Sequence, residues 1–154
     1  MYRASSSSAR YLSQNRAWNF SATTPAGSFT RPMLTAAIVQ ACLDVMGSED
    51  CDAAIAATPV ADTIKEAAGE VVLRTLDRDR LWAIQTPQVF RRDALERALA
   101  LGDAALAAAT DDASLIEGFG GEVRLVPTTS QNFKVTTPED LHLAELILRD
   151  RRRR

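Results

Sequence analysis

The chain has 154 residues, of which 46% are apolar and 25% charged, and its formal net charge is −2. These values suit one globular domain with a core, and the near-neutral charge gives no reason to expect nucleic acid or an anionic membrane as a partner. No apolar run approaches the ~18 residues that cross a bilayer. The cysteines, Cys42 and Cys51, lack a metal-binding spacing and indicate reduced, structural thiols inside a cell.

The two ends of the chain differ from its middle. Residues 1–30 contain no Asp or Glu and carry four consecutive serines at positions 5–8. This composition is typical of disorder, of a start codon read upstream of the true frame, or of an organelle transit peptide. We expect a disordered low-complexity segment rather than a plastid transit segment. At the other end, residues 151–154 are arginines, which we interpret as a solvated basic tail.

The first predicted elements are one helix and three strands. Apolar residues at helical spacing predict an amphipathic helix over 33–47 that stops at Gly47. Short apolar runs predict strands over 53–60, 71–75 and 81–84. The third strand is expected to end where two amides and a hydroxyl interrupt the apolar run, either at a turn or at a ligand pocket.

The second half of the chain predicts three more helices and two short strands. One helix is expected from Asp93 to about 109, and the next is capped by Thr110. Strands follow over 123–127 and 133–135. The last helix has the clearest start, with Thr137 as its cap and Pro138 in the first helical position. Alternating strands and helices predict an α/β fold with a largely parallel sheet.

Polar side chains follow several of these strands, where ligands bind in open α/β sheets. They are Asp62, Thr63 and Lys65; Gln85, Thr86 and Gln88; Thr110 and Asp111; and Lys134, Thr136 and Thr137. Hydroxyls, amides, lysines and helix N-termini suit a phosphorylated, polyhydroxylated substrate. Each of these residues also has an ordinary interpretation as a turn, a helix cap or a surface group. The single histidine, His142, lies within the last helix and is interpreted as a surface residue.

Three segments carry a family resemblance. They read PVADTIK (59–65), TLDRDRLWAIQTPQVFRRDAL (75–95) and ATDDASLIEGFGGEVRLVPTTSQNFKVTTPEDLHLAE (109–145). In order and spacing they resemble the C-terminal half of the 2-C-methyl-D-erythritol 4-phosphate cytidylyltransferase family, over about 31–148. The resemblance implies an incomplete Rossmann-like nucleotidyltransferase sheet with flanking helices and a dimerisation arm. It also implies transfer of a cytidylyl group from CTP to 2-C-methyl-D-erythritol 4-phosphate, with release of pyrophosphate, in non-mevalonate isoprenoid biosynthesis.

The resemblance implies roles for individual residues. Arg80 and Lys134 would be catalytic and hold the substrate phosphate for attack. The methylerythritol phosphate would be contacted by Thr63, Thr86 and Thr110. The family is homodimeric, and an arm between the first and third strands reaches into the partner. Thr63 and Arg80 would therefore serve the neighbouring subunit's site.

The chain departs from the family pattern near its start. The Gly-rich loop that cradles the CTP phosphates has no counterpart before residue 28. In the stretch GSFTRP (27–32), Arg31 agrees with the family and is a predicted substrate-binding residue, but Ser28 stands where the aspartate that binds Mg²⁺ is expected. A hydroxyl is a poorer Mg²⁺ ligand than a carboxylate. We expect a truncated or frameshifted reading frame and weak or no activity.

Two other interpretations stay open. The same phosphate-holding residues would serve a cytidylyltransferase acting on ribitol 5-phosphate. Alternatively, the chain is a non-catalytic remnant that keeps the arm and only dimerises. For the enzyme, the expected partners are CTP, the sugar phosphate, Mg²⁺ and a second copy of the chain, in the bacterial cytoplasm.

Overall fold

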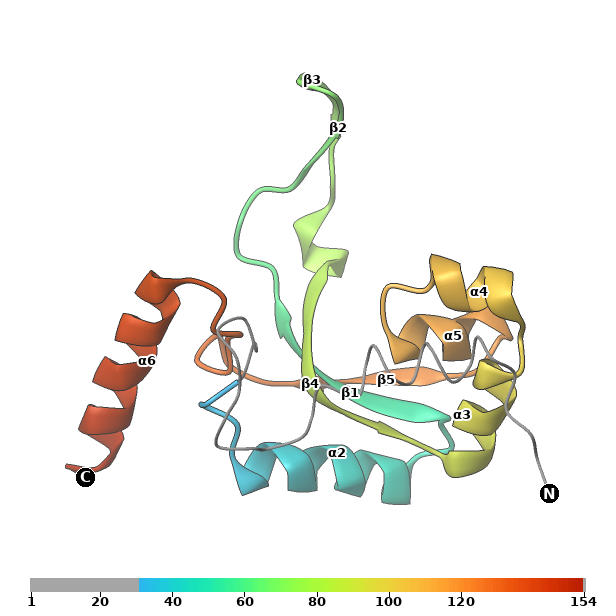
Figure 1. The fold of residues 1–154 in the computed structure, drawn as a ribbon, viewed down its shortest axis with the longest axis horizontal. Coiled ribbons are helices and arrows are strands. Elements are labelled where there is room, and N and C mark those ends of the chain that lie inside the picture. The colour runs from blue at the N-terminus through green and yellow to red at the C-terminus, as the bar shows by residue number, and fades with distance from the viewer. Residues whose placement is uncertain (1–30, 154) are drawn as a thin grey trace.

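The computed structural model describes residues 31–153. The predictions for residues 1–30, Ser28 among them, and for Arg154 lie outside the described residues. The elements in chain order are α2 (Ala36–Ser48), β1 (Ala53–Pro59), β2 (Lys65–Ala68), β3 (Val71–Thr75), the short 3-10 helix η1 (Arg78–Arg80), β4 (Trp82–Phe90), α3 (Arg92–Leu99), α4 (Asp103–Ala108), α5 (Asp112–Gly118), β5 (Val123–Pro127) and α6 (Pro138–Arg151). Figure 1 shows their arrangement.

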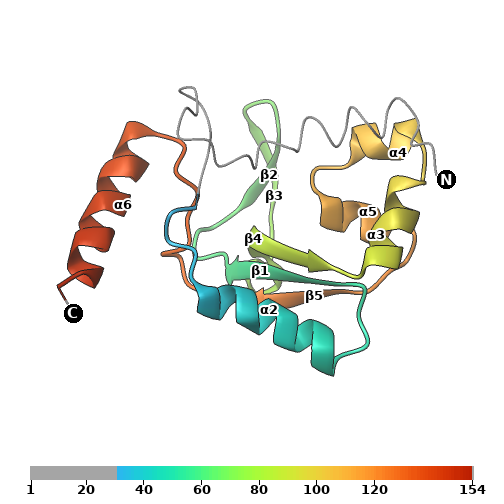
Figure 2. The same ribbon diagram turned by 60° about the horizontal axis from the view of Figure 1, so that its bottom comes forward.

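Three strands form the central sheet, in the order β4, β1, β5 (Figure 2). β1 pairs with β5 in parallel and with β4 antiparallel. The α/β fold is confirmed, but the prediction of a largely parallel sheet is wrong for the described strands. The reason lies in the connections: parallel neighbours need a helical crossover, which α3 to α5 supply, whereas the arm between β1 and β4 turns the chain straight back.

β4 is longer than the sequence predicts. It continues from Trp82 through the polar residues to Phe90, so the prediction that this strand ends at residue 84 is wrong. Ile84 pairs with Ala57 and Gln88 pairs with Ile55, so β4 has more residues between these two pairs than β1 has. The extra residues make a bulge in β4. Pro87 lies inside the bulge, where a residue without an N–H group can be placed in a strand, and the peptide bond before it is cis.

Small side chains in β1 let helices pack on both faces of the sheet. Cys42 of α2 is buried against Ala54 and Ala56 of β1 and Val126 of β5. Burial raises the pKa of the Cys42 thiol, which keeps it protonated. α2 begins three residues later than predicted because Thr35 caps it, its hydroxyl accepting from Ile38 N at 3.4 Å.

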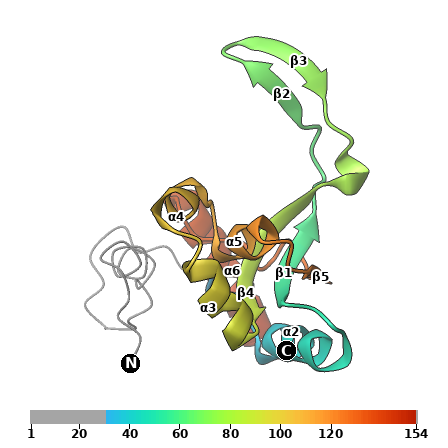
Figure 3. The same cartoon turned by 90° about the vertical axis from the view of Figure 1, so that its right-hand side faces the viewer.

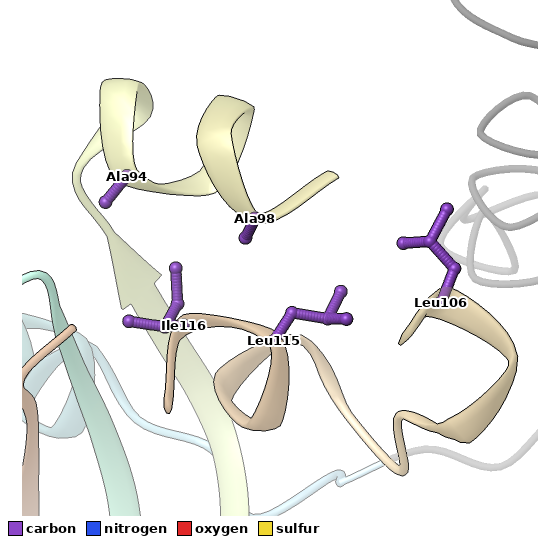
Figure 4. Packing of buried hydrophobic residues seen from close by; sticks show 5 residues of the cluster. All are labelled: Ala94, Ala98, Leu106, Leu115 and Ile116. Carbon is purple, nitrogen blue, oxygen red and sulfur yellow. The ribbon is translucent and has the colours of Figure 1, made fainter. Parts of the chain in front are cut away.

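The other face carries a second cluster, built by α3, α4 and α5 (Figure 4). Its buried members are Ala94, Ala98, Leu106, Leu115 and Ile116. The single helix predicted over 93–109 is in fact two helices. The chain breaks at Gly102, which has a φ of 95° and precedes the first residue of α4. Left-handed backbone of this kind favours glycine and cannot continue a helix.

The cap of α5 also differs from the prediction. Asp111, not Thr110, is the N-cap: its Oδ1 accepts from Ser114 N at 2.9 Å, and Ser114 Oγ reaches back to the Asp111 backbone. A carboxylate is a strong cap because it satisfies a free N–H and complements the helix dipole. Thr110 is left exposed in the connection before the helix.

β2 and β3 form a hairpin that stands away from the sheet (Figure 3). The sequence predicts β3 correctly but misses β2, whose residues are polar and alanine. Gly69 makes the turn with a φ of 58°. Across the hairpin, Lys65 Nζ donates to Thr75 Oγ1 at 2.6 Å. Every residue of both strands is exposed, so cross-strand pairing alone holds this arm together.

α6 lies at the opposite end of the structure from α3 and α4 (Figures 1 and 2). Its predicted start is confirmed, with Thr137 and Asp140 forming a capping box and Pro138 as the first residue. Instead of the strand predicted over 133–135, only a single bridge residue, Val135, forms. Arg151, which the sequence assigns to the basic tail, is the last residue of this helix. Within 31–153 no helix is long and apolar enough to cross a membrane.

Candidate functional site

A buried polar network joins β4 to the loop between β5 and α6. Gln85 is 5% exposed and Asn132 only 1%. Asn132 Nδ2 donates to Gln85 Oε1 at 2.8 Å and to the Thr86 carbonyl at 2.9 Å. Gln85 Nε2 donates in turn to the Thr129 carbonyl at 3.3 Å. The Gln85 amide, which interrupts the apolar run of β4, is therefore satisfied by partners in this loop, as burial of polar groups requires.

Thr128 ties the same loop to β1. Its backbone N donates to the Ala57 carbonyl at 2.8 Å. Its hydroxyl oxygen lies 2.8 Å from Gln85 Oε1 and 3.1 Å from the Ala57 carbonyl, and one proton can serve either acceptor. Among the buried side-chain atoms that the structure describes, Asn132 Oδ1 has no hydrogen-bond partner. Both protons of the Asn132 side-chain amide are donated, while the side-chain oxygen Oδ1 accepts no hydrogen bond.

Arg31 lies against this network. Its Nη1 donates to the Asn132 carbonyl and its Nη2 to the Ile84 carbonyl at 3.3 Å. Partial burial lowers the pKa of the Arg31 guanidinium, although an arginine stays charged at any physiological pH. The sequence predicts Arg31 as a substrate-binding residue. Two of its five N–H donors hold backbone carbonyls, which fixes the position of the charge.

The network links two predicted site residues, Arg31 and Thr86, to the loop that carries a third, Lys134. Thr86 is half-buried, and its carbonyl is held by Asn132. Lys134 is exposed in the same loop, two residues after Asn132. Because Arg31 binds the backbone of Asn132 as well, one buried amide links Arg31, Thr86 and the loop that carries Lys134.

Thr110 is attached to the same strand through its neighbour. Gln88 Nε2 donates to Asp111 Oδ2 at 3.3 Å, so β4 is bonded to the cap of α5. Thr110 directly precedes this cap. Only Pro87 separates Thr86 from Gln88, and the α5 cap therefore meets β4 close to the network.

Thr63 and Arg80 form a separate group at the foot of the arm. Both are exposed: Thr63 lies between β1 and β2, and Arg80 is the last residue of η1. The foot is held by Leu76 N donating to the Ile64 carbonyl at 2.9 Å and by Arg78 Nη1 donating to the Ala61 carbonyl at 3.1 Å. The predicted site residues thus divide between β4 with its loops and the arm.

An open groove of about 420 Å³ borders the network on the side of α2. It is lined by Met33, Thr35, Ala37, Ile38, Ala41, Pro127, Thr128, Thr129, Gln131, Asn132 and Arg151. None of the six predicted site residues is among these lining residues, so we do not assign the substrate to this groove. In residues 31–153, no group of three or more His, Cys, Asp or Glu side chains could hold a metal ion.

Asn132 is not among the residues that the sequence predicts for the site, and the buried pairing of Gln85 with it is not predicted either. Their only sequence signal is that each amide stands beside apolar residues, in AIQT and QNF. Two amides can satisfy each other when buried, but nothing in a single sequence says that positions so far apart are partners.

Comparison with known proteins decides the family. Residues 27–150 match the family model of 2-C-methyl-D-erythritol 4-phosphate cytidylyltransferase. The chain belongs to this family. The match begins at residue 27, slightly before the start of about 31 that the resemblance suggests. The enzymes of this family are nucleotidyltransferases, as the resemblance implies.

Two curated members of the cytidylyltransferase family show the extent of the similarity. The protein from Rubrobacter xylanophilus is 58% identical over 106 residues, which cover 69% of this chain and 46% of that protein. The protein from Deinococcus radiodurans is 46% identical over 117 residues, which cover 76% of this chain and 50% of that protein. The chain therefore spans about half the length of the curated relatives it matches.

Solved structures of the family agree with the fold. The cytidylyltransferase from Thermus thermophilus superposes with a TM-score of 0.67 at 34% identity, covering 77% of this chain and 58% of that one. The enzyme from Francisella tularensis gives a TM-score of 0.73 at 29% identity, covering 89% and 67%. The expected nucleotidyltransferase sheet with flanking helices is confirmed.

Proposed function

We propose that the chain carries the acceptor-substrate side of an enzyme that transfers a cytidylyl group from CTP to 2-C-methyl-D-erythritol 4-phosphate. A phosphate oxygen of the sugar phosphate attacks the α-phosphorus of CTP, a new P–O bond forms, and the bond to the leaving pyrophosphate breaks. The relatives bear the name of this activity. The product belongs to non-mevalonate isoprenoid biosynthesis, which we place in the bacterial cytoplasm.

The observation that carries the proposal is that one buried residue, Asn132, links Arg31, Thr86 and the loop that carries Lys134. The reacting groups are all anionic, so catalysis is chiefly positioning and neutralisation of charge. The Lys134 ammonium is a compact charge that suits a phosphate, and the hydroxyls of Thr86 and Thr110 suit its oxygens or those of the sugar. We assign Lys134 to the substrate phosphate, and Arg31, Thr86 and Thr110 to substrate binding.

We assign the arm to a homodimer. Its side chains Val71, Val72 and Leu73 are 67%, 55% and 59% exposed, an apolar patch that a partner surface could cover. Thr63 and Arg80 at its foot would then complete the partner's site, Arg80 acting on the substrate phosphate. The position of both residues away from the first group supports this arrangement.

Mg²⁺ belongs to the proposal as a family expectation. The residues described here offer no cluster of metal ligands, so we route no step through the ion. Mg²⁺ would neutralise the CTP phosphates, whereas Lys134 and Arg80 would neutralise the attacking phosphate. The buried free thiols Cys42 and Cys51 are in keeping with a reducing compartment.

Pyrophosphate release tests the proposal. The chain is incubated with CTP, Mg²⁺ and 2-C-methyl-D-erythritol 4-phosphate, and ribitol 5-phosphate serves as a second acceptor. Variants Arg80→Ala and Lys134→Ala should abolish the weak release expected of this chain, whereas Arg92→Ala, an exposed arginine on α3, should leave it unchanged.

Equal release by all variants would contradict the assigned roles. Faster release with ribitol 5-phosphate would assign the chain to that activity instead. A stable dimer that neither binds CTP nor releases pyrophosphate with either acceptor would support the non-catalytic interpretation.

A further inference from the structure

We propose that Asn132 is a positioning residue, which fixes the loop of Lys134 against Thr86 and so sets the geometry of the acceptor site. This inference rests on the proposed function. It begins from the burial of Asn132, whose side chain is 1% exposed although it lies in a loop where its neighbours Gln131 and Phe133 are more accessible. Burial of an amide is costly unless its polar atoms form hydrogen bonds, so the partners of Asn132 indicate its role.

Asn132 makes three hydrogen bonds to partners outside its own loop. Its Nδ2 donates one proton to Gln85 Oε1 and the other to the Thr86 carbonyl, while its backbone carbonyl accepts from Arg31. Turning the amide over would set its oxygen against these two acceptors, so the network fixes its orientation. Asn132 thus connects β4, the loop after β5 and the start of the described chain.

No other side chain of this size can make the same contacts. Leucine has the volume without the donors, and aspartate replaces the donating nitrogen with an oxygen that faces two acceptors. Lys134 follows Asn132 by two residues and takes its position from this anchor. Without the anchor, the loop that carries Lys134 loses its hydrogen bond to the Thr86 carbonyl.

The test is made by NMR on the whole chain without ligand. In the unmodified chain the side-chain amide protons of Asn132 should exchange with solvent slowly, while those of the neighbouring Gln131 exchange fast. In Asn132→Ala and in the nearly isosteric Asn132→Leu, the backbone amide signal of Thr86 should shift, although Thr86 is distant in sequence. Hydrogen exchange over 128–136 should rise at least tenfold.

Two controls separate positioning from general destabilisation. Gln131→Ala removes an adjacent amide that bonds Arg151 rather than β4. Leu115→Ala weakens the core under α5, where Leu115 is 2% exposed, without touching the loop. Below their melting temperatures, both should leave the Thr86 signal and the exchange of 128–136 as in the unmodified chain.

Several results would contradict a positioning role for Asn132. Fast exchange of the Asn132 amide protons, or an unmoved Thr86 signal in both Asn132 variants, would overturn the proposal, as would equal effects of Leu115→Ala. Titration with 2-C-methyl-D-erythritol 4-phosphate then tests the site: affinity should fall at least tenfold in Asn132→Leu and stay unchanged in Gln131→Ala. If the unmodified chain does not bind this phosphate, the proposed function fails, but the ligand-free spectra still decide the role of Asn132.

Discussion

Gln88 of β4 and Asp111, the cap of α5, are bonded at 3.3 Å from Nε2 to Oδ2. The other carboxylate oxygen of Asp111 accepts from Ser114 N at 2.9 Å. One side chain therefore starts a helix and attaches that helix to the central sheet. Because Asp111 makes both bonds, it fixes the position of the loop that carries Thr110.

Replacing Asp111 should lower stability more than an ordinary loss of a helix cap. Asp111→Ala removes the cap of α5, a loss of about 1 kcal/mol in the free energy of unfolding, and leaves Gln88 without this partner. Asp112→Ala, in the first turn of the same helix, serves as the control and should cost less. Urea unfolding measures both, and an equal loss in the two variants would contradict this account.

Gly121 should not tolerate a larger residue. A Cβ atom there would lie 2.6 Å from Ile116 Cγ2, 2.8 Å from the Phe119 ring and 3.0 Å from Asp52 Oδ2. Overpacking of this kind costs about 1–3 kcal/mol. Gly121→Ala should therefore lower the melting temperature.

The matched variant for this prediction is Gly47→Ala in the last turn of α2. Nothing lies within 4 Å of a Cβ at Gly47. Alanine is favoured over glycine inside a helix by up to about 1 kcal/mol, so this change should raise the melting temperature. If the melting temperature shifted in the same direction in both variants, the space around each glycine would not explain its effect on stability.

Local signals in the sequence predicted the parts of the fold that depend on neighbouring residues. The start of α6 is an example, because Thr137, Pro138 and Asp140 form a capping box without help from the rest of the chain. The antiparallel direction of β4 and its passage through Pro87 were not predictable in this way. They depend on β1, which pairs with it across the sheet.

The candidate site shows the same division. The family motifs supplied Arg31, Thr86 and Lys134 as site residues. Asn132 joins Arg31 and Thr86 to the loop of Lys134, and its partner Gln85 is 47 residues away. A single sequence reveals periodicity and caps, but it does not pair distant amides.

The arm should be required for dimerisation but not for the fold of the protomer. Val71 and Leu73 project from the same face of β3 and are 67% and 59% exposed. Val71→Ser combined with Leu73→Ser should weaken or abolish the dimer, because apolar contact area is lost. The melting temperature of the monomer should change little. Light scattering coupled to size exclusion measures the mass, and a dimer of undiminished stability would contradict the role given to the arm.

The start of α6 should depend on pH through Asp140. Its carboxylate accepts from Thr136 N, from Thr136 Oγ1 and from Thr137 N, at 2.9, 2.8 and 2.9 Å. These hydrogen bonds, the one from the Thr136 backbone first, lower the pKa of Asp140 below its ordinary value. A lowered pKa in the folded state means that the stabilisation is present above the ordinary carboxyl pKa and is lost as the pH falls through the folded value. The first turn of α6 should therefore fray in acid.

Hydrogen exchange of residues 136–141 between neutral and acidic pH measures this loss. Asp140→Asn should fray at neutral pH already and show little further change in acid, because its amide cannot ionise. Glu139→Gln removes a charge from the same turn and is the matched control; it should keep the acid-dependent fraying of the unmodified chain. An identical pH profile in the unmodified chain and in Asp140→Asn would show that another group controls this end of α6.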